Sequence, residues 1–161
     1  MGSDARSTAP RETLPPSYHD LIETTPCLVC RLSGDGRVLA VNSYALDVTG
    51  YPADELLGKN WWDLLYPGEH RDQVDGLYRR FERGEVGDYE MRLVSRDGGT
   101  RIVRWNSLNV RDEGRLVEIN GVGLDITQHR TSQEALLLHE ERYRNLFNSI
   151  GDPIYIHERG G

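Results

Sequence analysis

The sequence contains little cysteine and no long apolar segment. Its only two cysteines are Cys27 and Cys30, too few for a disulfide framework, so nothing indicates an oxidising compartment. No apolar run approaches the length that spans a bilayer, and residues 1–16 lack the apolar centre of a signal peptide. We therefore expect a cytoplasmic protein without direct membrane contact, in which the polar residues 1–16 form a disordered tether.

An excess of positive charge is also missing. The formal net charge is -7, which argues against binding to nucleic acid through a basic face. Arg79, Arg80 and Arg83 lie close together, but Asp75 and Glu82 alternate with them, so this segment predicts a solvated helix face. The chain has 161 residues, of which 37% are hydrophobic, so it can form a core without disulfides or metals.

Motifs of catalytic and metal sites are missing as well. The sequence has no Ser-His-Asp set, HExxH motif or phosphate loop, and a small hydrolase would lack a convergent nucleophile and base. Cys27 and Cys30 have CxxC spacing, but residues three apart on a strand point to opposite faces, and there is no second CxxC to complete a zinc site. We expect neither an enzyme nor a metal site, and we interpret Cys30 as a small buried hydrophobe.

The sequence does contain clear strand and helix signals. Apolar runs at 28–32 and 38–41 flank Gly34-Asp35-Gly36, which predicts a hairpin. Frequent glycine and proline between 43 and 68 predict several short helices. A helix is expected over 69–83, a short one over 17–24, and strands over 89–95, 100–110 and 115–124. Two groups of strands separated by helices favour an α+β fold with an antiparallel sheet.

The segment 128–150 has high helix propensity and predicts a connecting helix. Apolar residues and one histidine recur there at spacings of three and four, a pattern typical of a two-helix seam: Leu136, His139, Tyr143, Leu146 and Ile150. We expect its apolar members to pair with a second copy, giving a homodimer.

The end of the chain repeats a sequence pattern found near its beginning. Residues 142–147 repeat the Tyr and Leu pattern of 17–22, and 153–155 then fall where 28–30 lie in the first copy. We interpret 151–161 as the start of a second domain, and the chain as a piece of a longer tandem protein.

Several segments resemble the PAS domain family, and they occur in the family's order between residues 18 and 127. They are 36–42, which ends in Asn, 49–59, 61–67, 89–93, 96–98, 104–105 and the closing 121–127. The resemblance implies a sensory domain over 17–127, with a five-stranded antiparallel sheet carrying short helices on one face. It further implies an output domain in the same parent chain, often a histidine kinase or a cyclic-dinucleotide enzyme, reached through the flanking helices.

The resemblance also bears on cofactors, of which we favour none. Light-sensing members need a flavin-reactive cysteine in the segment corresponding to 58–65, which here has none. Haem-binding members use a histidine on the long helix, but His70 lies at the helix start and Val74 holds the position facing the pocket. Redox flavin members often carry a tryptophan near the third strand, where this chain has residues 87–89, Gly-Asp-Tyr.

A small-molecule pocket is the first functional hypothesis. Its candidate residues are Asn42, Trp62, Tyr89, Met91, Trp105, Ser107 and Asn109. Tryptophans commonly fill a core instead, and a register error of one residue would exchange the strand members of the set. The alternative hypothesis is therefore a ligand-free interaction or dimerisation domain whose side chains fill the core.

Asp125 and Thr127 are the candidate signal relay. Thr127 is expected to cap the connecting helix at its N-terminus, and Asp125 to bond back to the sheet or to an arginine. Together they would lock the helix to the sheet, so that a strain in the sheet turns or slides the helix.

Overall fold

The computed structural model describes residues 16–150, together with the side chains of residues 18–142, 144 and 145. The helices are α1 (Pro16–Thr24), α2 (Ser43–Thr49), α3 (Ala53–Leu56), α4 (Trp61–Leu65), the 3-10 turn η1 (Gly68–His70), α5 (Arg71–Phe81) and α6 (Thr127–Ile150). The strands are β1 (Leu28–Ser33), β2 (Val38–Val41), β3 (Val86–Val94), β4 (Thr100–Asp112) and β5 (Arg115–Asp125).

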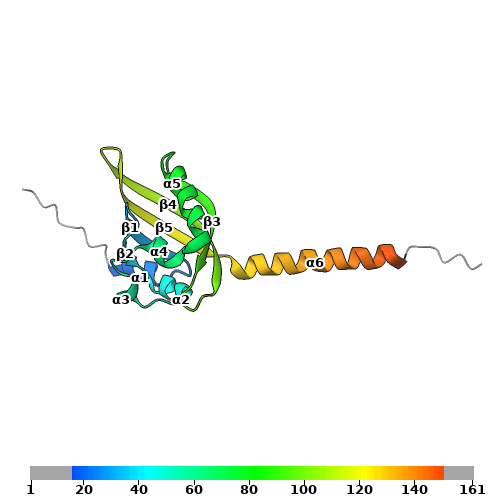
Figure 1. Cartoon of the computed structure of the whole chain (residues 1–161). Coiled ribbons are helices and arrows are strands. Elements are labelled where there is room, and N and C mark those ends of the chain that lie inside the picture. Colours follow the sequence, from blue (N-terminus) through cyan, green and yellow to red (C-terminus); the bar gives the residue numbers. More distant parts are fainter. Residues whose placement is uncertain (1–15, 151–161) are drawn as a thin grey trace, which may run out of the picture.

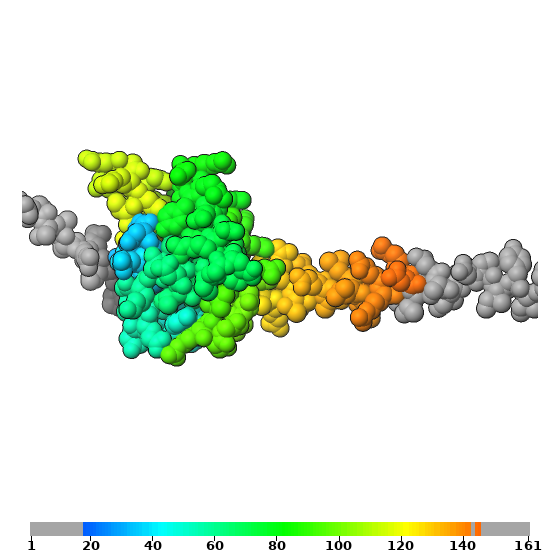
Figure 2. Space-filling model, in the orientation of Figure 1, coloured from blue at the N-terminus to red at the C-terminus, as the bar shows by residue number. Residues whose placement is uncertain are grey.

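The strands form one five-stranded sheet in the order β2-β1-β5-β4-β3, with every neighbouring pair antiparallel. The helices between β2 and β3 pack on one face of this sheet, while α6 leaves the end of β5 and points away from the domain (Figure 1). The predicted α+β class, five-stranded antiparallel sheet and C-terminal helix are confirmed. Figure 2 shows α6 as a narrow extension of the globular body.

Local capping explains why the segment between β2 and α5 breaks into short helices. The side chain of Asn42 accepts a hydrogen bond from the Ala45 N–H at the start of α2. The side chain of Asn60 accepts from the N–H groups of Trp62 and Asp63 at the start of α4. Each asparagine satisfies amides that the first turn of a helix leaves unpaired, so each fixes a new helix start.

The core lies between the inner face of the sheet and these helices. Alternate residues of the strands face inward, among them Leu28, Cys30 and Leu32 of β1, which are all buried. Met91 and Leu93 of β3 are buried while Arg92 between them is exposed, so the strand alternates between the core and solvent.

β3 begins at Val86, earlier than the predicted start at Tyr89. A bulge between Val86 and Tyr89 interrupts the alternation, and Asp88 has a positive φ of 52°. The Asp88 N–H donates to the Asn106 side-chain oxygen at 3.2 Å, which holds the bulge against β4. A bulge adds an unpaired residue, so the period of two on which the prediction rested is lost there.

Several predictions concern the two ends of the chain. Residues 1–15 of the expected tether and the proposed second-domain start at 151–161 lie outside the described residues, whereas Pro16 already belongs to α1. Within residues 16–150, no helix is both long and apolar enough to cross a membrane.

Candidate functional site

A small cavity lies in the core between the sheet and helices α4 and α5. Its volume is about 20 Å³, which is room for roughly one water molecule. It is lined by Cys30, Leu32, Trp61, Trp62, Leu77, Phe81, Val86, Met91, Trp105, Asn106, Ser107, Ile119 and Gly121. No lysine, arginine, aspartate, glutamate or histidine is among these residues, so the cavity is uncharged.

All three tryptophans of the chain line this cavity. Trp61 and Trp105 meet edge to face with ring centres 6.1 Å apart. The indole N–H of Trp105 donates to the Tyr66 hydroxyl at 3.2 Å, and that of Trp62 donates to the Tyr78 hydroxyl at 3.0 Å. Because protein groups already accept from both indoles, these rings present mainly apolar surface to the cavity.

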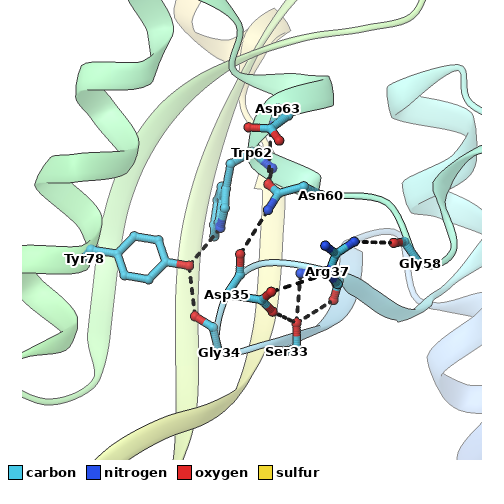
Figure 3. A network of polar contacts seen from close by, with 9 residues as sticks. All are labelled: Ser33, Gly34, Asp35, Arg37, Gly58, Asn60, Trp62, Asp63 and Tyr78. Atoms are coloured by element: carbon cyan, nitrogen blue, oxygen red, sulfur yellow. Dashed lines mark hydrogen bonds and ion pairs between the residues drawn. The ribbon is translucent and has the colours of Figure 1, made fainter.

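A polar network ties the β1–β2 turn to α4 and α5 beside Trp62 (Figure 3). The Tyr78 hydroxyl, which accepts from Trp62, donates to the Gly34 carbonyl at 3.1 Å. The Asn60 side chain donates to the Asp35 carbonyl at 3.0 Å. At Gly36, where φ is +91°, an added Cβ would lie 2.2 Å from the Trp62 indole nitrogen, so the turn needs glycine there.

Two polar atoms on the inner face of β4 are buried without a hydrogen-bond partner among the described residues. They are the Ser107 hydroxyl oxygen and the Asn109 side-chain oxygen. Ser107 lines the cavity, and the Asn109 amide nitrogen donates to the Gly84 carbonyl at 3.4 Å. Because buried polar atoms are nearly always paired, Ser107 gives the cavity wall an unused hydrogen-bonding group, and Asn109 lies just outside the lining.

Burial keeps the other ionisable groups around the cavity neutral. Desolvation raises the pKa of the Cys30 thiol to about 12, opposed in part by a hydrogen bond from the Gly121 backbone. Desolvation also raises the pKa of Tyr66 far above its ordinary value. The Cys30 thiol therefore stays protonated near neutral pH, which matches its interpretation as a buried hydrophobe.

Four of the predicted pocket residues line the cavity, namely Trp62, Met91, Trp105 and Ser107, and the other three do not. Asn42 is buried at the junction of α1, β1 and α2. Its side-chain oxygen accepts from the N–H groups of Val29 and Ala45, and its amide donates to the carbonyls of Ile22 and Cys27. All its capacity is used within the protein, so Asn42 is a structural connector.

Tyr89 and Asn109 are the other two predicted residues outside the lining. Tyr89 lies against α5, where its hydroxyl donates to the Gln73 carbonyl at 3.2 Å and the Arg80 guanidinium lies 4.6 Å from its ring centre. Asn109 lies two residues beyond Ser107 on the same face of β4. Both residues border the core. Strand alternation predicts which residues face inward, but not which of these line the cavity.

Asp125 and Thr127 join the sheet to α6, and Asp125 takes the helix-capping role predicted for Thr127 in addition to its predicted pairing with an arginine. The Asp125 carboxylate accepts from the backbone N–H of Thr127 at 2.9 Å and from its hydroxyl at 2.5 Å, so Asp125 serves the helix start. The Thr127 hydroxyl oxygen accepts from the Ile102 N–H of β4 at 2.9 Å, so Thr127 bonds back to the sheet. Arg101 lies 4.0 Å from Asp125.

A second link between sheet and helix escaped the sequence prediction. The Glu90 carboxylate on β3 accepts from Arg130 on α6 at 2.7 and 2.6 Å and from Arg104 on β4 at 3.2 Å. These arginines hold the pKa of Glu90 below its ordinary value, with the Arg130 hydrogen bond as the largest cause. Glu90 and Arg130 are far apart in sequence, so no local pattern could have paired them.

The link at Glu90 is adjacent to the cavity. Met91, the next residue of β3, lines the cavity on the inner face of the sheet. Met91 also borders a polar depression of about 280 Å³ that includes Glu90, Arg130 and Gln73. One strand therefore contacts both the core cavity and the first turns of α6.

Beyond the first turn of α6, the described side chains of residues 131–142, 144 and 145 are exposed. Leu136, one of the predicted dimer contacts, is 59% exposed, and Leu137 and Leu138 beside it are exposed as well. The side chains of the other three predicted contacts, Tyr143, Leu146 and Ile150, lie outside the described residues.

Known proteins are similar to this chain in sequence. The model of a family described as PAS fold matches residues 22–131, more than half of the chain. A sensor histidine kinase, TmoS, of Ectopseudomonas mendocina is 28% identical over 134 residues, which cover 75% of this chain and 14% of that protein. The uncharacterized protein y4lL of Sinorhizobium fredii is 24% identical over 102 residues, 63% of this chain and 12% of that protein. The chain thus spans only a small part of either relative.

Solved structures agree on the fold. An RNA-binding light-oxygen-voltage receptor superposes with a TM-score of 0.66 at 19% identity, covering 88% of this chain and 41% of that one. A PAS domain of an HTR-like protein from Haloarcula marismortui gives a TM-score of 0.53 at 24% identity, covering 68% and 89%. A PAS domain from a two-component sensor histidine kinase gives 0.54 at 19% identity, covering 66% and 91%.

Proposed function

This chain belongs to the PAS fold family, and we propose that it is a sensory module that reports the state of its core to an output domain through α6. The observation that carries the proposal is the pair Met91 and Glu90. Met91 lines the cavity, while Glu90 beside it holds Arg130 of α6. A change in the cavity wall therefore has a short physical route to the helix.

The size of the cavity supports a coupling between binding and movement. A volume of about 20 Å³ holds roughly one water molecule, so a larger ligand must displace part of the wall. Met91 is the wall residue best suited to move, because an unbranched thioether side chain adopts many rotamers. Its displacement would shift β3 and change how Glu90 meets Arg130.

The junction at α6 is suited to being shifted by a modest free energy. Glu90 and Arg130 keep 32% and 41% of their side-chain surface exposed, and such ion pairs contribute about 0.2–1 kcal/mol each. A ligand changes an equilibrium only by its difference in affinity for the two states, commonly a few kcal/mol. Contacts of this strength can therefore be rearranged by ligand binding in the core.

We further infer that the module works as a homodimer within a signalling protein, with a histidine kinase or a cyclic-dinucleotide enzyme as the output domain. The likeness to a sensor histidine kinase supports the first of these outputs, and the exposed Leu136 supports pairing through α6. The module itself is inferred to bind and transmit, with catalysis left to the output domain. Sedimentation of the parent chain and of Leu136→Glu measures the oligomeric state. Pairing through α6 predicts a dimer for the parent chain and a monomer for the variant.

A metabolite screen tests the sensory function directly. The melting temperature of the chain is measured with a library of cellular metabolites, since a ligand that binds the folded state raises it. Any compound found is then added while amide hydrogen exchange is followed at Arg130 and Thr131 of α6. The proposal predicts a changed exchange rate at both amides, and a bound compound that leaves α6 unchanged would contradict the relay.

The second candidate function is a ligand-free dimerisation domain. The small size of the cavity favours it, because side chains already fill most of the core. It predicts that no metabolite raises the melting temperature. It also predicts that Leu136→Glu abolishes the dimer and with it all self-association of the chain.

A further inference from the structure

Two unpaired polar atoms on β4 restrict the chemical class of ligand that the cavity could bind. The Ser107 and Asn109 side-chain oxygens are buried, lie two residues apart on the inner face of β4 and have no partner among the described residues. An unpaired buried polar atom destabilises the folded state, so a ligand group that bonds to Ser107 in the cavity wall would recover this loss. Asn109 offers an acceptor, and the Ser107 hydroxyl can donate or accept.

The remaining walls exclude a charged ligand. No charged side chain lines the cavity, and the Trp62 and Trp105 indoles already donate to Tyr78 and Tyr66. The Cys30 thiol is held neutral by its burial. A carboxylate or ammonium group placed here would be desolvated without a partner, which costs far more than a neutral group does.

The unpartnered atoms lie toward the end of the cavity where β4 meets the C-terminal end of α5. The Asn109 amide donates to the Gly84 carbonyl, and the Arg111 guanidinium donates to the carbonyl of Phe81, a residue that lines the cavity. In Figure 1 this end of α5 and the β4–β5 hairpin point in the same direction.

We propose that the cavity binds a small uncharged alcohol or phenol, whose hydroxyl forms a hydrogen bond with the Ser107 hydroxyl at the cavity wall. The apolar part of the ligand lies against the three tryptophans and displaces Met91. This proposal rests on the sensory function proposed above and specifies the ligand class of the same cavity.

The test uses the three indole N–H signals of the chain in NMR spectra, because every tryptophan lines the cavity. Phenol, fluorobenzene and benzoate are titrated separately, since they share a ring but differ in hydroxyl and charge. Phenol is expected to shift the indole signals at the lowest concentration, fluorobenzene at a higher one, and benzoate not at all.

Two variants sharpen the test. Ser107→Ala is expected to weaken phenol binding about 3- to 10-fold, the range for one neutral hydrogen bond, and to leave fluorobenzene binding unchanged. Ser95→Ala is the matched control, because Ser95 bonds only within the β3–β4 turn. Indole spectra recorded without added compound show whether each variant is folded.

The outcomes separate the two proposals. Binding of benzoate in preference to phenol would overturn the ligand class and leave the sensory function standing. If phenol binds no more tightly than fluorobenzene, and if Ser107→Ala binds both as tightly as the parent chain does, recognition of the hydroxyl alone is overturned. If none of the three compounds shifts an indole signal, this ligand class is overturned, and the metabolite screen alone decides whether the cavity senses a ligand.

Discussion

The cavity and the α6 junction are held together by different forces. Around the cavity, buried aromatic and aliphatic side chains provide the stability, and no charged residue takes part. At the junction, a few partly exposed polar groups connect α6 to β3 and β4. Burial of large apolar side chains is worth several kcal/mol per residue, whereas exposed ion pairs are worth less than about one. A strongly stabilised core therefore lies beside a helix whose contacts small energies can rearrange.

The largest expected effect comes from removing an aromatic wall. Trp105→Ala should lower the free energy of unfolding by about 3–5 kcal/mol, because it removes buried surface and leaves a larger cavity. Urea unfolding followed by circular dichroism measures this change. A loss below 1 kcal/mol would mean that the aromatic wall is not what stabilises the domain.

An intermediate effect is expected at the hydrogen-bonded part of the junction. Thr127→Val keeps the shape of the side chain but removes the acceptor for the Ile102 N–H and the donor to Asp125, with an expected cost of about 1–3 kcal/mol. Thr131→Val is the control, because the Thr131 hydroxyl bonds only to the Thr127 carbonyl within the exposed helix. Equal losses of stability in both variants would show that the sheet contact of Thr127 is unimportant.

Breaking the ion pairs of Glu90 is expected to change the stability of the domain little and the amide exchange of α6 more. Glu90→Gln should lower the free energy of unfolding by less than about 1 kcal/mol yet speed amide exchange at Arg130 and Thr131. Glu55→Gln is the control, because Glu55 pairs with Arg96 away from α6. Unchanged α6 exchange in Glu90→Gln would remove Glu90 from the relay.

The smallest effect is a dependence of the junction on pH. Arg130 and Arg104 lower the pKa of Glu90 from its ordinary 4.5, so the ion pairs stabilise the folded state above about pH 4.5 and are lost as the pH falls through the lowered pKa. The titration of the Glu90 carboxyl carbon in NMR spectra measures this midpoint. Arg130→Gln should move the midpoint upward, and an unchanged midpoint would show that Arg130 does not hold the carboxylate.

The sequence predicted most of the fold, because its signals are local. Glycine turns, glycine and proline breaks and alternating strands act over a few residues, and the helices and strands between residues 16 and 150 follow them closely. The one clear shift, at the start of β3, comes from a bulge that breaks the alternation at Asp88.

The site was predicted only in part, because its contacts are long-range. Met91, Trp105 and Ser107 could be placed on an inner face by alternation alone. Whether Asn42 lines a cavity or connects α1 to β1 depends on carbonyls that the chain brings to it from elsewhere. The ion pair of Glu90 with Arg130 depends on where β3 lies in the sheet relative to the end of β5, which strand order decides and a sequence pattern does not.

The most direct test of the account fills the cavity from within and observes α6. An added Cβ at Gly121 would lie 2.9 Å from the Cys30 sulfur and press on the cavity wall, whereas one at Gly87 would meet only the Asn106 side chain at 3.6 Å. Amide hydrogen exchange at Arg130 and Thr131 is compared between Gly121→Ala and the control Gly87→Ala. We expect Gly121→Ala to change exchange at these α6 amides more than at the protected amides of β1, and the control to change neither. Altered indole signals in Gly121→Ala with unchanged exchange in α6 would contradict coupling between the core and the helix.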